Sequence, residues 1–191
     1  MSKKVAIIVG SLREGSYAHQ IAKIAANMFD QEFETEFVEI RDLPLYDADY
    51  DNEAMTHKPL PESYTVFRNK IKEADGVLFV TPENNRTIPA CLKNAVDIGS
   101  KPNGDVAWTK TPAGIISHSV GAMGGYSSHK NLRLALSYFN MPITQQPEVF
   151  LGHSPELLKE DGSGFKTEST TQFVQGYIDL FQELIRKNPK K

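Results

Sequence analysis

Short apolar runs separated by amphipathic segments recur along the chain, and five of these runs have the pattern of β-strands. Residues 5–9 are β-branched or small and apolar throughout, which is typical of a strand buried on both faces of a parallel sheet. Residues 76–81 and 113–117 repeat this character. Residues 34–40 alternate weakly between apolar and polar, and residues 148–151 give a short fifth strand.

Amphipathic helices are predicted after each of these strands. Ser16 suits the N-cap of the first helix, in which Ile21, Ile24, Ala25 and Met28 follow at helical spacing. The other helices are marked by four apolar stripes: Tyr64, Phe67 and Ile71; Leu92, Ala95 and Val96, behind Pro89; Leu132, Ala135, Leu136 and Phe139; and, in the terminal helix, Phe173, Tyr177, Leu180, Phe181 and Leu184.

Alternating strands and helices predict a parallel sheet covered by helices on both faces, with right-handed crossovers. For five strands we expect the order 2-1-3-4-5, which is the flavodoxin-like three-layer α/β sandwich. The chain contains no internal repeat, linker or low-complexity tract, so residues 1–191 are expected to form a single domain.

The composition narrows the class of protein. A formal net charge of −3 without basic clusters argues against a nucleic-acid partner. The apolar run before Gly10 is too short for a signal peptide or a membrane span, so we expect a cytoplasmic protein without a membrane partner. Cys91 is the single cysteine and is expected to be a buried small apolar residue. The five histidines show no paired ligand spacing, so we expect no metal site.

Three polar loops follow strands and are expected to meet at the carboxyl edge of the sheet, where ligands bind in open α/β folds. They cover residues 10–16, 82–87 and 117–125. In the first loop, hydroxyl groups, backbone N–H groups and a helix N-terminus predict a phosphate site, and Arg13 can add a charge-assisted hydrogen bond. The alternative is an ordinary strand-to-helix turn. Ser16 stands where a P-loop has lysine, which favours a phosphomonoester over a nucleoside triphosphate.

Four motifs occur in a fixed order in residues 4–155. They are Gly10-Ser11-Leu12-Arg13-Glu14-Gly15-Ser16, Thr81-Pro82-Glu83-Asn84-Asn85, Ile88-Pro89-x-x-Leu92-Lys93-Asn94-Ala95-x-Asp97 and Gly121-x-x-Gly124-Gly125. Together they resemble the NAD(P)H-dependent FMN reductase family, which includes quinone, chromate and azo-dye reductases. The third motif and the Thr-Pro-Glu sequence of the second are the most specific parts of this resemblance.

The resemblance implies a set of cofactor-binding residues. Ser11, Arg13 and Ser16, with Tyr17 and Ala18 behind them, are expected to hold the FMN phosphate. Pro82, Glu83, Asn84 and Asn85 are expected to line the isoalloxazine ring and the ribityl chain. The pyrimidine side of the ring is expected to face a third group: Ser117, His118, Ser119, Gly121, Met123, Gly124 and Gly125.

The resemblance also implies the reaction. FMN is the cofactor and NAD(P)H the co-substrate, and a ping-pong hydride transfer delivers the electrons to a quinone, free flavin, azo compound or similar small acceptor. The flavin carries the chemistry, so no catalytic side chain is expected. This chain departs from the family pattern at Asn84, where an aromatic residue is usual, at Ala18, where asparagine is usual, and at Ile98, where tryptophan is usual. The change at Asn84 bears on the choice of substrate.

Two other functions stay open from the sequence. One is a flavodoxin-type electron carrier, although the Ser/Arg loop and modest charge favour the enzyme. The other is a degenerate member that binds FMN, or no ligand, without oxidising NAD(P)H. The resemblance implies a homodimer or homotetramer that uses residues 92–97 and 41–62 as contacts. Tyr46 and Tyr50 in the latter segment either cover a partner's flavin or, as we favour, pack on their own chain.

Overall fold

The strands expected from the sequence form one parallel sheet. The computed structural model describes residues 2–190, and in this part of the chain the sheet order is β2-β1-β3-β4-β5. This order confirms the flavodoxin-like fold. The strand bounds are β1 (Lys3–Val9), β2 (Phe33–Phe37), β3 (Gly76–Pro82), β4 (Ala113–His118) and β5 (Val149–Leu151).

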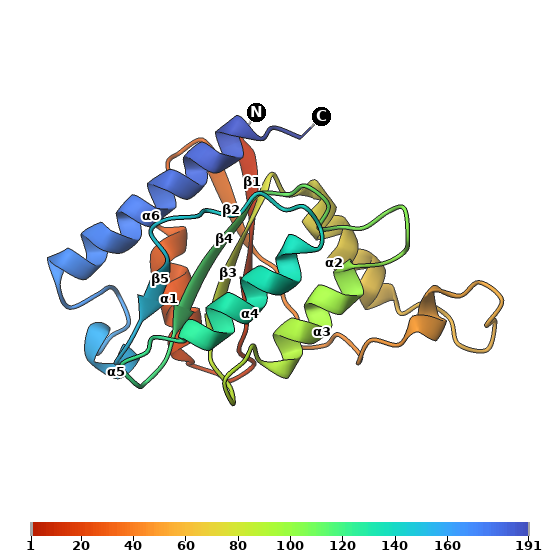
Figure 1. Cartoon of the computed structure of the whole chain (residues 1–191), viewed down its shortest axis with the longest axis horizontal. Helices are drawn as coiled ribbons and strands as arrows, with labels where there is room; N and C mark the ends of the chain where they lie inside the picture. The colour runs from red at the N-terminus through yellow and green to blue at the C-terminus, as the bar shows by residue number, and fades with distance from the viewer. Residues whose placement is uncertain (1, 191) are drawn as a thin grey trace.

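Helices cover both faces of the sheet (Figure 1). One face carries α1 (Tyr17–Ala26) and α6 (Glu168–Lys187), and the other carries α2 (Glu62–Glu73), α3 (Ala90–Gly99) and α4 (Tyr126–Ser137). Two short elements were not predicted from the sequence, the 3-10 helix η1 (Ala48–Asp51) and α5 (Ser154–Leu157). No helix in residues 2–190 is long and apolar enough to cross a membrane.

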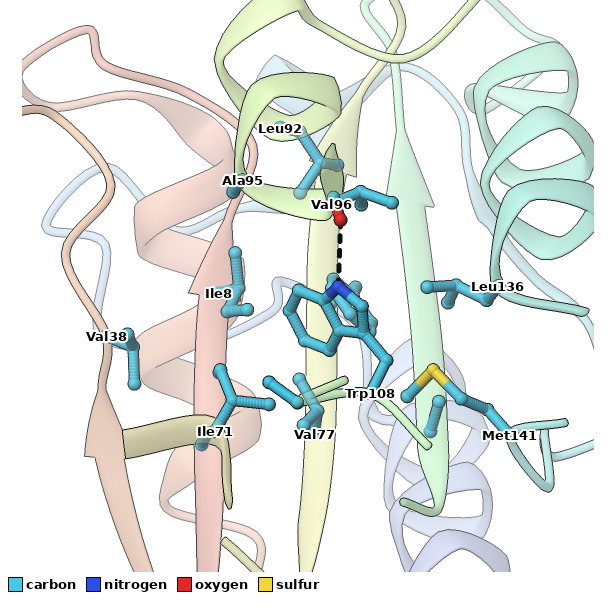
Figure 2. Packing of buried hydrophobic residues seen from close by; sticks show 14 of the residues in the cluster. Ile8, Val38, Ile71, Val77, Leu92, Ala95, Val96, Trp108, Leu136 and Met141 are labelled. Atoms are coloured by element: carbon cyan, nitrogen blue, oxygen red, sulfur yellow. Dashed lines mark hydrogen bonds between the residues drawn. The ribbon is translucent and has the colours of Figure 1, made fainter. Parts of the chain in front are cut away.

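Each central strand supplies two cores because successive side chains point to opposite faces. In β1, Val5 and Ile7 pack toward α1 and α6, whereas Ala6 and Ile8 pack toward α2, α3 and α4. Trp108 lies at the centre of the second core, although it belongs to the connection between α3 and β4. Figure 2 shows its indole Nε1, which donates a hydrogen bond of 2.9 Å to the Val96 carbonyl.

The core face of α6 differs from the predicted stripe. Tyr177 and Phe181 are buried as expected, but Phe173 and Leu180 are 41% and 40% exposed. The buried positions around them include Val174, Ile178 and Ile185, so the helix is rotated by about one residue relative to the prediction. Apolar residues occupy two adjacent stripes of this helix, and periodicity alone does not choose between them. In the observed rotation Ile185 packs directly on Gly76 of β3, since its Cδ1 atom lies 2.6 Å from where a Cβ atom of Gly76 would be.

The segment between β2 and α2 extends away from the sheet toward the right of Figure 1. Tyr50 packs edge-to-face on Tyr64 with ring centroids 5.7 Å apart, and the Tyr64 hydroxyl donates to the Pro44 carbonyl at 3.0 Å. Arg68 holds Asp51 through two hydrogen bonds of 2.8 Å. The tyrosines of this segment therefore pack on their own chain, as the favoured interpretation expected.

Candidate functional site

The three polar loops meet at the carboxyl edge of the sheet, at the bottom of Figure 1. Their strands are direct neighbours, since β3 pairs with both β1 and β4. The first loop is fixed to β3 by a hydrogen bond of 2.8 Å from Gly10 N to the Val80 carbonyl. The connection after β1 leads to α1 on one face of the sheet, and the connection after β3 leads to α3 on the other face. The boundary between β1 and β3 is therefore the switch point, where a ligand is expected.

The first loop presents a cation at the start of α1. Ser16 is the N-cap, and its Oγ accepts a hydrogen bond from His19 N at 3.2 Å. Ser16 N closes a turn onto the Arg13 carbonyl at 3.2 Å, and Arg41 donates to the Leu12 carbonyl at 2.7 Å. The exposed Arg13 guanidinium lies 5.6 Å from the Tyr17 ring centroid and forms no ion pair within residues 2–190. A fixed turn, free N–H groups and an uncommitted guanidinium together suit a phosphate group.

The second loop is a tight turn at the end of β3. Asn84 and Thr87 exchange backbone hydrogen bonds of 3.0 Å in both directions. Asn85 and Arg86 between them have φ angles of 50° and 67°, as a type I′ turn requires. Asn131 of α4 holds the turn from outside by donating to Thr87 Oγ1 at 3.0 Å. The turn exposes the Asn84 and Asn85 side chains to a cavity of about 510 Å³ between α3 and α4.

Glu83 links the second loop to α4. Gly125, the N-cap of α4, has no side chain to satisfy the first N–H groups of that helix. Glu83 Oε2 accepts from Ser127 N at 2.8 Å and from Ser128 N at 3.2 Å in its place. The carboxylate also lies at the positive end of the helix dipole, which is favourable. Glu83 therefore acts on the shape of the site by fixing the position of the loop.

We expect Glu83→Ala to lower the free energy of unfolding by about 1–2 kcal/mol, because it removes a helix cap that comes from a distant segment. Glu83→Gln keeps an acceptor oxygen and is expected to retain about half of this contribution. Urea unfolding at neutral pH measures both changes. Glu14→Ala removes an exposed carboxylate of the first loop and serves as the control. Equal stability of Glu83→Ala and the wild type would contradict the capping role.

The third loop contains both buried and open members. Ser117 Oγ is fully buried and bonds to the Gly124 carbonyl at 2.9 Å, which folds the loop back onto β4. Gly121 and Met123 are exposed, and the Met123 side chain is 58% exposed. Ser117 therefore stabilises the loop, whereas Gly121 and Met123 are accessible to a ligand.

His118 ends β4 and is only 5% exposed. Its Nδ1 lies 2.8 Å from Ser154 Oγ, and its Nε2 is buried without a hydrogen-bond partner. Burial, with a smaller contribution from the Arg13 guanidinium, lowers the pKa of His118 to about 4. The imidazole is therefore neutral at physiological pH, and the ring packs edge-on against Tyr17 with centroids 6.5 Å apart.

The sequence-predicted residues divide by exposure. The exposed ones are Arg13, Asn84, Asn85, Gly121 and Met123. The half-buried ones are Ser11, Tyr17, Pro82, Glu83 and Ser119, and the buried ones are Ser16, Ala18, Ser117, His118, Gly124 and Gly125. Ala18 is fully buried in the core beneath α1, so its side chain offers no surface to a ligand. Ser154 was not predicted, because it lies 36 residues from His118 and belongs to a helix without a sequence signal. A cavity of about 610 Å³ lies elsewhere, between α2 and the segment before it.

Comparison with known proteins decides the family. Residues 3–156 match the family described as NADPH-dependent FMN reductase. The chain is 40% identical to a quinone reductase of Pseudomonas putida over 184 residues, which cover 96% of this chain and 95% of that protein.

The chain belongs to the NADPH-dependent FMN reductase family.

Two further relatives match almost the whole chain. A 2-hydroxy-1,4-benzoquinone reductase of Burkholderia sp. is 37% identical over 97% of this chain and 98% of that protein. The solved structure of FerB, a flavoenzyme NAD(P)H:(acceptor) oxidoreductase from Paracoccus denitrificans, has a TM-score of 0.87 at 33% identity. It covers 97% of this chain and 98% of the FerB chain. The agreement extends over the whole sheet and its helices.

The residues at the switch point fit FMN, the cofactor of this family. The orphaned Nε2 of His118 is a buried polar atom that needs a partner, and Arg13 is a cation that needs an anion. FMN carries both an anionic phosphate and neutral hydrogen-bond donors. The switch point of a flavodoxin-like sheet is also where this nucleotide binds in such folds.

Proposed function

We propose that this protein is an FMN-dependent oxidoreductase that moves electrons from NAD(P)H to quinones and similar small acceptors. The observation that carries the proposal is Arg13, an exposed cation without an ion pair in residues 2–190, just before the N-terminus of α1. It lies where the three loops meet at the switch point of the sheet, in a chain of the FMN reductase family. When bound, FMN supplies the redox chemistry by taking a hydride from NAD(P)H and passing its electrons to the acceptor.

The chain contributes binding and orientation in this proposal. Arg13, Ser11 and the N–H groups at the start of α1 hold the phosphate. The turn around Asn84 and Asn85 and the loop from Ser119 to Gly125 flank the ring. The Glu83 carboxylate and the Ser117 hydroxyl keep these two loops in place through α4 and β5. None of these residues moves a proton.

The acceptor is proposed to enter through the cavity of about 510 Å³ beside the Asn84 turn. Ile88 and Ala135 give it apolar walls, and Asn84, Asn131 and Lys93 give it polar ones. A mixed lining suits a quinone, whose flat ring is apolar and whose carbonyl oxygens accept hydrogen bonds. Free flavin and azo compounds are further acceptors within the proposal. The proposal also includes a homodimer or homotetramer, which is supported by two exposed apolar side chains, Leu134 on α4 (73% exposed) and Tyr138 at its C-cap (84% exposed).

Purified protein titrated with FMN and then supplied with NADPH or NADH and 1,4-benzoquinone tests the proposal. We expect saturable FMN binding and FMN-dependent loss of absorbance at 340 nm, with the rate depending on the quinone. A reaction without protein and one without FMN are the controls. FMN binding without oxidation of either pyridine nucleotide would instead favour a flavodoxin-type carrier or a degenerate member. Absence of FMN binding would overturn the cofactor assignment.

A further inference from the structure

The hydrogen bonds around His118 fix the position of its proton. Ser154 is fully buried, and its Oγ lies 2.7 Å from the Ser119 carbonyl and 2.8 Å from His118 Nδ1. The carbonyl can only accept, and a serine hydroxyl has a single proton, so Ser154 donates to Ser119. His118 Nδ1 must then donate to Ser154. In a neutral imidazole this leaves a lone pair, and no proton, on Nε2.

This lone pair has no partner in residues 2–190. A buried acceptor without a hydrogen bond is costly and is uncommon in native proteins. Two other buried side-chain atoms share this state, His129 Nδ1 and Thr144 Oγ1. His129 lies 3.9 Å from Glu148 in the contact between α4 and the start of β5, so it belongs to the scaffold. His118 differs from it because it belongs to the third loop of the site and packs on Tyr17, which directly follows the first loop.

The neighbours of the His118 ring place it toward the cofactor loops. Its edge-to-face partner is Tyr17, the first residue of α1, and the Arg13 guanidinium lies 5.6 Å from the centroid of the same Tyr17 ring. Tyr17 thus connects Arg13 of the first loop with His118 of the third. The phosphate is expected at Arg13, and the remainder of the nucleotide is expected to pass His118.

We propose that His118 Nε2 accepts a hydrogen bond from a neutral donor of the bound flavin nucleotide, either a ribityl hydroxyl or the ring N–H group. The inference rests on the proposed function. A phosphate dianion has only acceptor atoms, so it cannot satisfy a lone pair. FMN carries hydroxyl groups and one ring N–H, and either can. Ser154 is the positioning residue that holds His118 in this tautomer.

Two substitutions distinguish the role of Nδ1 from that of Nε2 in His118. His118→Asn places an amide N–H near the Nδ1 position and keeps the bond to Ser154, but it has no acceptor near Nε2. His118→Gln places its carbonyl oxygen near Nε2 and keeps the acceptor. We expect the Asn variant to bind FMN and riboflavin roughly 3- to 10-fold more weakly than the wild type, and the Gln variant to stay within about 2-fold. Quenching of flavin fluorescence measures both ligands, and lumiflavin, which lacks the ribityl chain, distinguishes the two donors.

A second measurement reads the tautomer directly in the wild-type protein and uses a variant only to assign the signal. Proton–nitrogen NMR of uniformly ¹⁵N-labelled wild-type protein reports the tautomer of each histidine. We expect His118 to show a protonated Nδ1 and an unprotonated Nε2 without flavin, and the Nε2 resonance to move on FMN addition. The His118→Gln spectrum identifies the signal by its loss.

Three results would overturn the inference while leaving the proposed function intact. They are unchanged flavin affinity in His118→Asn, a loss seen with FMN but not with riboflavin, and a protonated Nε2 in the free protein. The second result would mean that Nε2 donates to the phosphate. Absence of FMN binding by the wild-type chain would overturn the proposed function and the inference together.

Discussion

Replacing Arg13 with alanine is expected to weaken FMN binding by roughly 10- to 100-fold, because a hydrogen bond to a charged group contributes about 1.5–3 kcal/mol. The guanidinium is exposed and has no internal ion pair in residues 2–190, so within the chain the substitution removes only its contact with the Tyr17 ring. The turn it belongs to is held by backbone atoms, through Ser16 N and the Leu12 carbonyl. The loop is therefore expected to keep its shape in the variant.

Titration of wild type and Arg13→Ala with FMN and with riboflavin measures this effect. Riboflavin lacks the phosphate, so its affinity is expected to change by less than about 2-fold. Lys23→Ala removes an exposed cation from α1, the helix that follows this loop, and is the matched protein control. Arg13→Lys is expected to recover part of the loss, since lysine offers a charge but no planar fork. An equal loss for FMN and riboflavin would place Arg13 at the ring instead of at the phosphate.

The fold followed from the sequence because its strands are nearly continuous apolar runs. Residues 5–9 and 76–81 have no alternative to a buried strand, and the alternation with helices then fixes a parallel sheet. Ser16 was identified as an N-cap from local chemistry alone, which its bond to His19 N confirms. The rotation of α6 was not accessible in this way, since it depends on where Ile185 meets the bare Gly76 in a neighbouring strand.

Within the site, the sequence predicted which segments come together, but it did not predict which side chains face a ligand and which hold the loops in place. The three loops are where the motifs placed them, but Ser117 and Glu83 are committed to internal hydrogen bonds with Val149 and Ser127, which belong to none of the motifs. Trp108 illustrates the same limit in the core, because its position between α3 and the sheet follows from packing against Phe67 and Phe79. Such assignments depend on contacts between distant segments, which local patterns do not encode.

Gly124→Ala is expected to lower the free energy of unfolding by about 2–5 kcal/mol, the largest effect on stability that we predict. The residue has φ +60°, which is unfavourable for any residue with a Cβ atom. A Cβ atom there would also lie 2.5 Å from the Phe150 carbonyl carbon and 2.8 Å from Leu151 N, both of which are backbone atoms of β5. Backbone in a sheet cannot rotate out of the way as a side chain can.

Thermal unfolding without flavin measures this change, with an expected fall in Tm of roughly 5–15 °C for a chain of this size. Gly121→Ala in the same loop is the matched control, because a Cβ atom at Gly121 would meet nothing within 4 Å. Its Tm is expected to stay within about 1–2 °C of the wild type. The Gly124 variant should also lose flavin affinity, since its displaced carbonyl would release the Ser117 hydroxyl that folds the loop onto β4. Equal melting of the two variants would mean that the loop can move away from β5, and that its close contact with this strand is not what shapes the site.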